Sequence, residues 1–240
     1  MTLKRAIAAA ALCLASVLLG AAGPRLAPEE LRHIRTVAVI SALGNSFQFE
    51  RVPDSAFEWL HSPDSLFLET SDWRIDPLVE KTLTENLSKR FKVETIAYRP
   101  ADFATWNAAL LRRATLDLNG DPGIDAYVIV LRDWRHDEIG DSVHRLGGLG
   151  LYRRDGRKPK YGVYACYRIV IVDALTGAVL ASRAAVTPDG ALPWIPADAA
   201  IWPKTPNALS EAQRNLLAAD EKKLVGATLL PTLIQMNLTR

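Results

Sequence analysis

Apolar residues are concentrated between Tyr161 and Ala185, and their spacing predicts the centre of a β-sheet. Up to Val172, both alternating sets of side chains are largely apolar, as in a strand with packing partners on both faces. Asp173 to Gly177 predicts a turn, because Asp can bond the backbone two residues on and Gly tolerates a left-handed conformation. The apolar run from Ala178 to Ala185 predicts the antiparallel partner strand.

Other apolar runs predict the strands around this hairpin. Thr36 to Leu43 is β-branched and apolar, which indicates a buried strand. Gly44-Asn45 is a two-residue hairpin signal, so we expect Ser46 to Val52 to pair with that first strand. Lys92 to Tyr98 predicts a short strand, and Asp125 to Arg132 predicts another buried one.

Two helices are expected in the first half of the chain. Asp76 and Pro77 suit the N-cap and the first helical position. An apolar residue then recurs every four positions as far as Phe91, which predicts a stripe that faces the core. Asp102 can cap a second helix that continues to about Ala114.

The C-terminal part combines an extended stretch with a helix. Thr187 to Asn207 is rich in proline and holds two tryptophans, which predicts a long Pro/Trp-rich loop. Ser210 and Gln213 form a capping box for a last helix, which Pro231 is expected to end or kink. The apolar side of this helix is expected to comprise Leu216, Leu217, Leu224 and Ala227.

The order of these elements predicts the fold class. Helix-linked strands favour parallel pairing, whereas hairpins add antiparallel strands. We therefore expect a single α/β (α+β) domain over residues 36–240, with a mixed sheet of about six to seven strands and helices packed against it. Pro53 to Ile75 and Asp133 to Lys160 have no clean period and are expected to be irregular.

The first 22 residues have the features of a signal peptide. Lys4 and Arg5 form a basic start, and the apolar run Ala6 to Leu19 is too short to span a bilayer comfortably. Small residues then lead to an expected cleavage site near Ala22, followed by a leader over residues 23–35. The mature protein is expected to be exported to a bacterial periplasm or secreted; retention of the segment as an anchor is the alternative.

Composition narrows the classes of partner. The chain has 240 residues and a formal net charge of +2, and cleavage would remove two cations and no acid. The resulting neutral protein is a poor candidate for nucleic-acid binding. No later segment is apolar enough to span a membrane. Cys166 would be the one remaining cysteine, and its apolar neighbours predict a buried, inert thiol.

Four segments of the chain resemble the α/β domain of the curli-secretion lipoprotein family and the activators of penicillin-binding proteins. The early strand is also similar to that of uncharacterised exported bacterial proteins that start with a VAVISALG-like strand. The resemblance implies an accessory role in the cell envelope without catalysis, and it transfers no catalytic residue. The matching segments are Thr36 to Leu43, Asp76 to Phe91, Asp125 to Leu131 and Tyr161 to Ala185.

One polar segment could carry metal chemistry. Asp133 to His144 follows a buried strand directly, and ligand sites in α/β sheets lie beyond the carboxyl ends of strands. Imidazole and carboxylate groups could there hold zinc or manganese for a hydrolase. The alternative is a solvated polar loop. The candidate ligands are His136, Asp137, Asp141 and His144.

A basic run and two tryptophans form the other candidate site. The run could bind an anionic polymer or a lipid head group, or it could be a solvated hairpin edge protected by positive charge. Trp194 and Trp202 could bind sugar or protein, or pack back over the sheet. The basic residues are Arg145, Arg153, Arg154, Arg157, Lys158 and Lys160.

The sequence thus favours a periplasmic accessory protein without catalysis or cofactor, which engages an envelope protein or a cell-wall component. It would bind through the basic run and the two tryptophans. The alternative hypothesis is the metal-dependent hydrolase, and it requires the side chains of His136 and His144 to converge.

Overall fold

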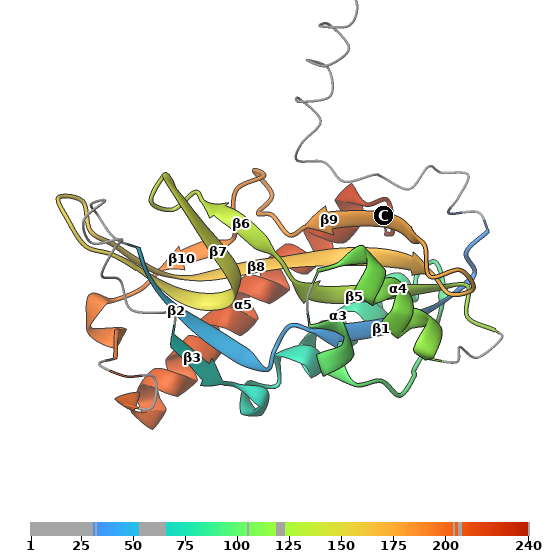
Figure 1. Ribbon diagram of the computed structural model, residues 1–240, viewed down its shortest axis with the longest axis horizontal. Coiled ribbons are helices and arrows are strands. Elements are labelled where there is room, and N and C mark those ends of the chain that lie inside the picture. The colour runs from blue at the N-terminus through green and yellow to red at the C-terminus, as the bar shows by residue number, and fades with distance from the viewer. Residues whose placement is uncertain are drawn as a thin grey trace, which may run out of the picture.

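The computed structural model describes residues 31, 33–52, 66–104, 106–118, 123–203, 205 and 208–239. Within these residues, three α-helices pack against one mixed ten-stranded sheet, which confirms the predicted α/β class with a sheet larger than expected (Figure 1). The predicted signal peptide lies outside the described residues. No helix in the described part is both long and apolar enough to cross a membrane. The helices are α3 (Ile75–Leu87), α4 (Ala108–Asp117) and α5 (Glu211–Gln235).

The long strand β8 (Lys160–Asp173) lies at the centre of the sheet. Its first half pairs with β7 (Ser142–Arg154) and β10 (Trp194–Pro196), and its second half with β5 (Ala126–Arg132) and β9 (Val179–Ala184). The predicted central hairpin is therefore confirmed.

The turn of that hairpin forms as its residues predict. The carboxylate of Asp173 accepts hydrogen bonds from the backbone N–H groups of Leu175 and Thr176, at 3.1 and 2.7 Å. Gly177 has a φ of 67°, a left-handed conformation that glycine adopts without strain. Local side-chain chemistry is thus sufficient to define this turn.

The predicted hairpin at Gly44-Asn45 is wrong. β1 (Thr36–Ala42) runs parallel to β5 and to β4 (Lys92–Glu94), whereas β2 (Ser46–Val52) runs parallel to β7. The chain therefore continues in one direction and moves from one pair of strands to the next.

Two charged side chains from elsewhere satisfy the backbone at this step between β1 and β2. The Asp76 carboxylate accepts from the Ser41 hydroxyl at 2.6 Å and from the backbone N–H groups of Leu43 and Gly44 at 2.8 and 3.0 Å. From β5, the Arg132 guanidinium donates to the Leu43 and Ser46 carbonyls. These bonds replace the hairpin ladder that the local sequence predicted.

The starts of α3 and α4 also differ from expectation. Asp76 lies inside α3, whose N-cap position is Arg74 with a φ of 55°. The predicted cap Asp102 lies in a short 3₁₀ helix (Pro100–Phe103), and α4 is capped instead by Asn107. In α5 the capping box of Ser210 is confirmed, and the helix continues past Pro231 to Gln235.

The segments expected to be irregular contain strands. β3 (Leu66–Glu69) pairs with β2, and residues 53–65 lie outside the described part. β6 (Trp134–Asp137) pairs with the first half of β7, and β10 interrupts the Pro/Trp-rich loop. The first residues of β7 alternate in exposure, whereas its later residues are buried on both faces. The strand therefore has no single hydrophobic period from which it could have been predicted. We call Trp134–Asp137 with Ser142–Gly147 the β6–β7 ribbon.

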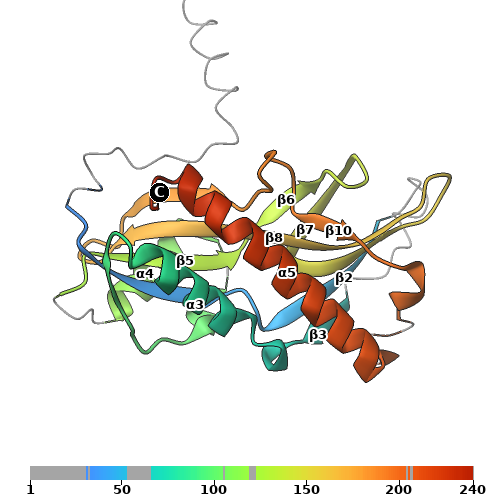
Figure 2. The same ribbon diagram turned by 180° about the vertical axis from the view of Figure 1, so that it is seen from behind.

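Alternate side chains of β8 face two different layers. Odd-numbered residues such as Tyr167 and Ile169 belong to the core cluster beneath α3 and α5, and α5 crosses that face diagonally (Figure 2). Even-numbered residues face the other side. Tyr164 and Cys166 share a cluster with Leu146 of the β6–β7 ribbon, and Val170 shares one with residues of α4. Cys166 is buried, as predicted.

The last helix buries a different face from the one expected. Leu217 and Leu224 are buried, but Leu216 is 49% exposed and Ala227 is exposed. The buried face also carries Glu221, which is fully buried. The predicted apolar side was therefore wrong at two of its four positions.

Candidate functional site

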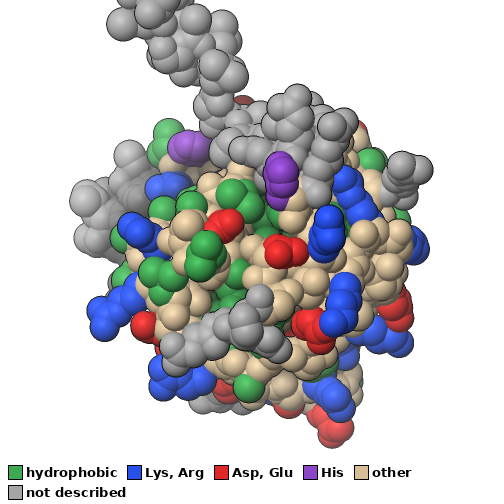
Figure 3. Space-filling view, turned by 90° about the vertical axis from the view of Figure 1, so that its right-hand side faces the viewer, with side chains coloured by type: hydrophobic (Ala, Val, Ile, Leu, Met, Phe, Trp, Pro, Cys, Tyr) green, Lys and Arg blue, Asp and Glu red, His purple; other side chains and the backbone are tan. Residues whose placement is uncertain are grey.

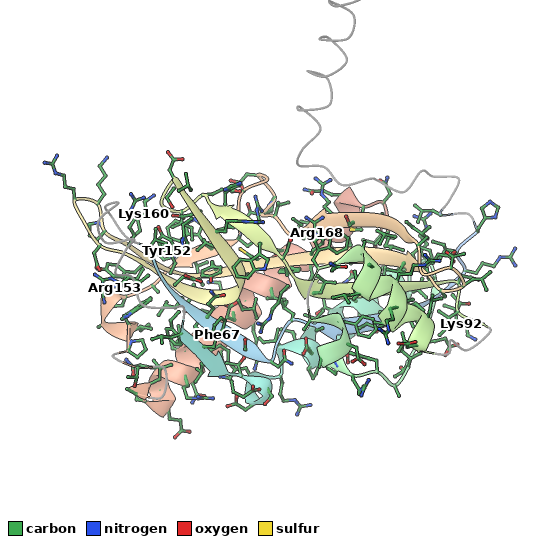
Figure 4. All side chains as sticks on the ribbon, in the orientation of Figure 1. Phe67, Lys92, Tyr152, Arg153, Lys160 and Arg168 are labelled. Carbon is green, nitrogen blue, oxygen red and sulfur yellow. The ribbon has the colours of Figure 1, made fainter. Side chains whose placement is uncertain are left out.

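The turn between β7 and β8 projects at one end of the molecule and carries most of the predicted basic run (Figure 1). The chain reverses over residues 155–159, where Gly156 has a φ of 117°. Figure 4 labels Arg153 and Lys160 at this end. Because the two strands are long and pair directly, the hairpin holds these side chains in a defined register.

Arg153 is fixed by an acid and two aromatic rings. Its Nε donates to both carboxylate oxygens of Asp155 at 3.0 Å. Its guanidinium lies 5.6 Å from the ring centre of Trp202 and 5.8 Å from that of Tyr161. Burial alone would raise the pKa of Asp155, but hydrogen bonds from Arg153 and Tyr161 lower it. The structure therefore brings together two predicted binding residues, Arg153 and Trp202.

The two tryptophans lie on opposite faces of the sheet. Trp202 packs edge-on against Phe49, in the core beneath α5, with ring centres 5.9 Å apart. Trp194 pairs opposite Tyr164 and packs beside Gly162 in the cluster on the other face. Both rings are half-buried, so each covers the sheet, and they do not form one aromatic surface.

Apart from Arg145, which lies opposite His136 on the β6–β7 ribbon, the rest of the basic run divides into two groups. The side chains of Arg154 and Lys160 donate to the carbonyls of Gly140 and Ile139 and so support the turn of the β6–β7 ribbon. Arg157 and Lys158 are exposed and make no side-chain hydrogen bond or ion pair with the part of the chain that is described. We use the term basic hairpin end for Arg51, Arg153, Arg157, Lys158 and Trp202.

Arg51 is the member of this group that the sequence analysis missed. Its Nε lies 3.3 Å from the Asp155 carboxylate, so it meets the hairpin from the neighbouring strand β2. The sequence did contain a pattern that could have indicated Arg51, because this residue continues the face of β2 that otherwise carries Phe47 and Phe49. A charged residue at the end of an apolar face indicates that the face reaches solvent there.

The predicted metal ligands do not converge. His136 lies opposite Arg145 on one face of the β6–β7 ribbon. His144 lies on the other face, where its Nε2 is 3.1 Å from a carboxylate oxygen of Glu50. Among the described residues, no group of three or more His, Cys, Asp or Glu side chains is placed to hold a metal ion.

The two predicted carboxylate ligands belong to the ribbon turn. Asp137 is buried and accepts hydrogen bonds from the Gly140 N–H at 2.7 Å, the Ser142 hydroxyl at 2.7 Å and the Tyr152 hydroxyl at 3.0 Å. Asp141 is exposed and has a φ of 52°. The turn therefore uses Asp137 as a structural acceptor.

No family model and no curated protein matches the chain. One similar solved structure is the crystal structure of protein XCC0632 from Xanthomonas campestris, of the family model DUF330. It has a TM-score of 0.32 and 9% sequence identity, and the match covers 85% of this chain and 88% of that chain. A match at this level assigns neither a family nor a function to the chain. The resemblance to the curli-secretion lipoproteins stays a prediction.

Proposed function

We propose that this protein is an exported binding protein that acts without catalysis. It engages an anionic cell-wall component, or an envelope protein with an anionic surface, through the basic hairpin end. The observation that carries the proposal is the placement of Arg153, whose guanidinium is fixed between Asp155, Trp202 and Tyr161 at a projecting hairpin.

The charges at this end suit an anionic surface. Arg153 presents a planar guanidinium whose position is already set, so little side-chain entropy is lost when a phosphate or carboxylate binds. Arg157 and Lys158 are exposed at the turn and add charge that no described acid neutralises. The opposite end of the molecule shows Lys, Arg, Asp and Glu side chains interspersed (Figure 3). An anionic polymer would therefore be attracted to one end.

The sequence supports the location of this activity. The basic start and short apolar run of residues 1–22 favour export, and the resemblance to envelope proteins implies an accessory role. Fractionation of cells that express the full chain tests this part of the proposal. We expect the protein in the periplasmic or extracellular fraction, and in the cytoplasm when residues 1–22 are deleted.

Removal of the two exposed cations is expected to weaken binding to anionic cell-wall material. A cation near an anionic surface contributes about 1 kcal/mol, so the double variant Arg157→Ala/Lys158→Ala should lose about thirtyfold in affinity at low salt. Co-sedimentation with purified cell-wall material measures this. Binding of the unchanged protein should also weaken as salt is raised.

A matched control removes two cations elsewhere. Lys222 and Lys223 are exposed on α5, so Lys222→Ala/Lys223→Ala changes the net charge equally and should bind as the unchanged protein does. Equal affinity of the hairpin and helix variants would show that only total charge matters and would refute the site. Absence of binding to every anionic envelope fraction would refute the function.

A further inference from the structure

A cleft with a volume of about 430 Å³ lies beside β6, between that strand and the segment that follows β9. It is separate from the basic hairpin end, since Arg168 of the cleft lies nearer the middle of the molecule than Arg153 and Lys160 (Figure 4). Its charged lining comprises four arginines and two carboxylates, which are Arg135, Arg145, Arg168, Arg183, Asp133 and Glu138.

The two carboxylates already have partners. Asp133 pairs with Arg168 at 2.9 Å, and Glu138 pairs with Arg135. Each acid thus pairs with one arginine, and the formal charge of the four arginines and two carboxylates of the lining is +2. A concave site with excess positive charge and low-dielectric walls attracts anions.

Arg168 is fixed on the sheet beside this cleft. It donates from Nε and from a terminal nitrogen to Asp133, and from its other terminal nitrogen to the Ser182 hydroxyl at 3.1 Å. Its guanidinium also lies 5.1 Å from the ring centre of Trp106. Because all three guanidinium nitrogens of Arg168 donate hydrogen bonds, its side chain has little freedom to move into the cleft.

Arg145 is the arginine available to a ligand. It is exposed, and its side chain has no hydrogen bond or ion pair with any described residue. The strand register places it opposite His136, and Trp134 lies on the same face of the ribbon. Trp134 is 48% exposed and packs beside Gly147, where a Cβ atom would meet its ring at 2.6 Å. A cation, an imidazole and an aromatic ring thus lie along one side of the cleft.

We propose that this cleft binds a small organic molecule that carries a phosphate or a carboxylate group. Arg145 and His136 hold the anionic group, and Trp134 contacts the organic part. Arginine binds both kinds of oxyanion through paired N–H donors. The cleft volume lies within the usual range for small-molecule sites. This activity is additional to envelope binding and does not depend on it.

Calorimetric titration of the full chain with phenyl phosphate, benzoate and inorganic phosphate tests the proposal. We expect saturable binding of one phenyl phosphate or benzoate per chain, with inorganic phosphate weaker because it lacks the ring. Arg145→Ala should weaken binding at least about tenfold, and His136→Ala by a smaller factor. Trp134→Ala should weaken the two aromatic probes but not inorganic phosphate.

The controls separate this site from the hairpin. The variant Arg157→Ala/Lys158→Ala should bind the probes unchanged, and Arg145→Ala should bind cell-wall material unchanged. Absence of saturable binding by all three probes, or equal binding by Arg145→Ala and the unchanged protein, would overturn the proposal. Binding to vesicles that contain phosphatidic acid without binding of phenyl phosphate would overturn it in favour of a lipid surface.

Discussion

Replacement of Asp76 by alanine is expected to lower the free energy of unfolding by about 2–5 kcal/mol, because buried donors lose their acceptor. One carboxylate oxygen accepts from the Ser41 hydroxyl and from the backbone N–H groups of Leu43 and Gly44. Leu43 is fully buried, so water cannot readily replace the lost acceptor there. The segment between β1 and β2, where the chain passes from one pair of strands to the next, should become the least stable part of the sheet.

Urea denaturation followed by circular dichroism measures this loss. Asp76→Asn keeps one acceptor oxygen and should lose less stability than Asp76→Ala. Asp102→Ala is the matched control, because the exposed ion pair of Asp102 with Arg99 should contribute under about 1 kcal/mol. A loss for Asp76→Ala no larger than that of the control would contradict the role assigned to this carboxylate.

Replacement of Glu221 by leucine is expected to stabilise the protein by about 1–3 kcal/mol at pH 7, the usual cost of a buried polar group without a good hydrogen bond. Neither carboxyl oxygen of Glu221 has a hydrogen bond of ordinary geometry among the described residues. Burial raises its pKa well above the usual 4.5, and the nearby Gly150 backbone N–H offsets only part of this. An apolar side chain of similar size removes that cost.

The effect of Glu221 on stability should depend on pH. In the folded protein the raised pKa lets the carboxyl hold its proton to a higher pH than in the unfolded chain, where it is released above the usual pKa of 4.5. The folded state therefore binds more protons, and the stability from this group is present below pH 4.5 and is lost as the pH rises toward the folded-state pKa. The advantage of Glu221→Leu should thus be smallest near pH 4.5 and grow toward neutral pH.

Thermal melts of both proteins between pH 4.5 and 8 measure this difference. Glu211→Leu, at the exposed start of the same helix, is the control and should show no such trend. A constant gap between Glu221→Leu and the unchanged protein across this range would mean that Glu221 titrates normally. A destabilised Glu221→Leu at pH 7 would mean that the carboxyl has a structural partner.

The fold was predictable where short-range chemistry defines it. The turn after Asp173 and the capping box at Ser210 depend on residues within three or four positions, and both form as predicted. The step after β1 could not be predicted, because its acceptor, Asp76, and its donor, Arg132, lie far away in the sequence. Without them, Gly44-Asn45 carries only its local hairpin preference.

The candidate site, too, could be predicted from the sequence only in part. A run of cations was visible in the sequence, but its division was not, because register decides which side chain reaches which partner. Arg154 and Lys160 support a turn formed earlier in the chain, whereas Arg145 lies beside a separate cleft. The pairing of Arg153 with Trp202 depends on a contact across 49 positions that no local pattern encodes.

The length of β8 sets the distance between the start of β1 and the basic hairpin end. β1 begins level with the last residues of β8, one strand away across β5. There the backbone N–H of Asp125 donates to the Thr36 carbonyl at 2.9 Å, and the backbone N–H of Ala174 donates to the Asp125 carbonyl at 3.0 Å. The basic hairpin end lies at the other end of this 14-residue strand, about 45 Å away. If the protein were attached through residues ahead of Thr36, the attachment would lie at one end of the molecule and the hairpin at the opposite end. β8 would then act as a stiff spacer that sets how far from its anchor the protein can reach.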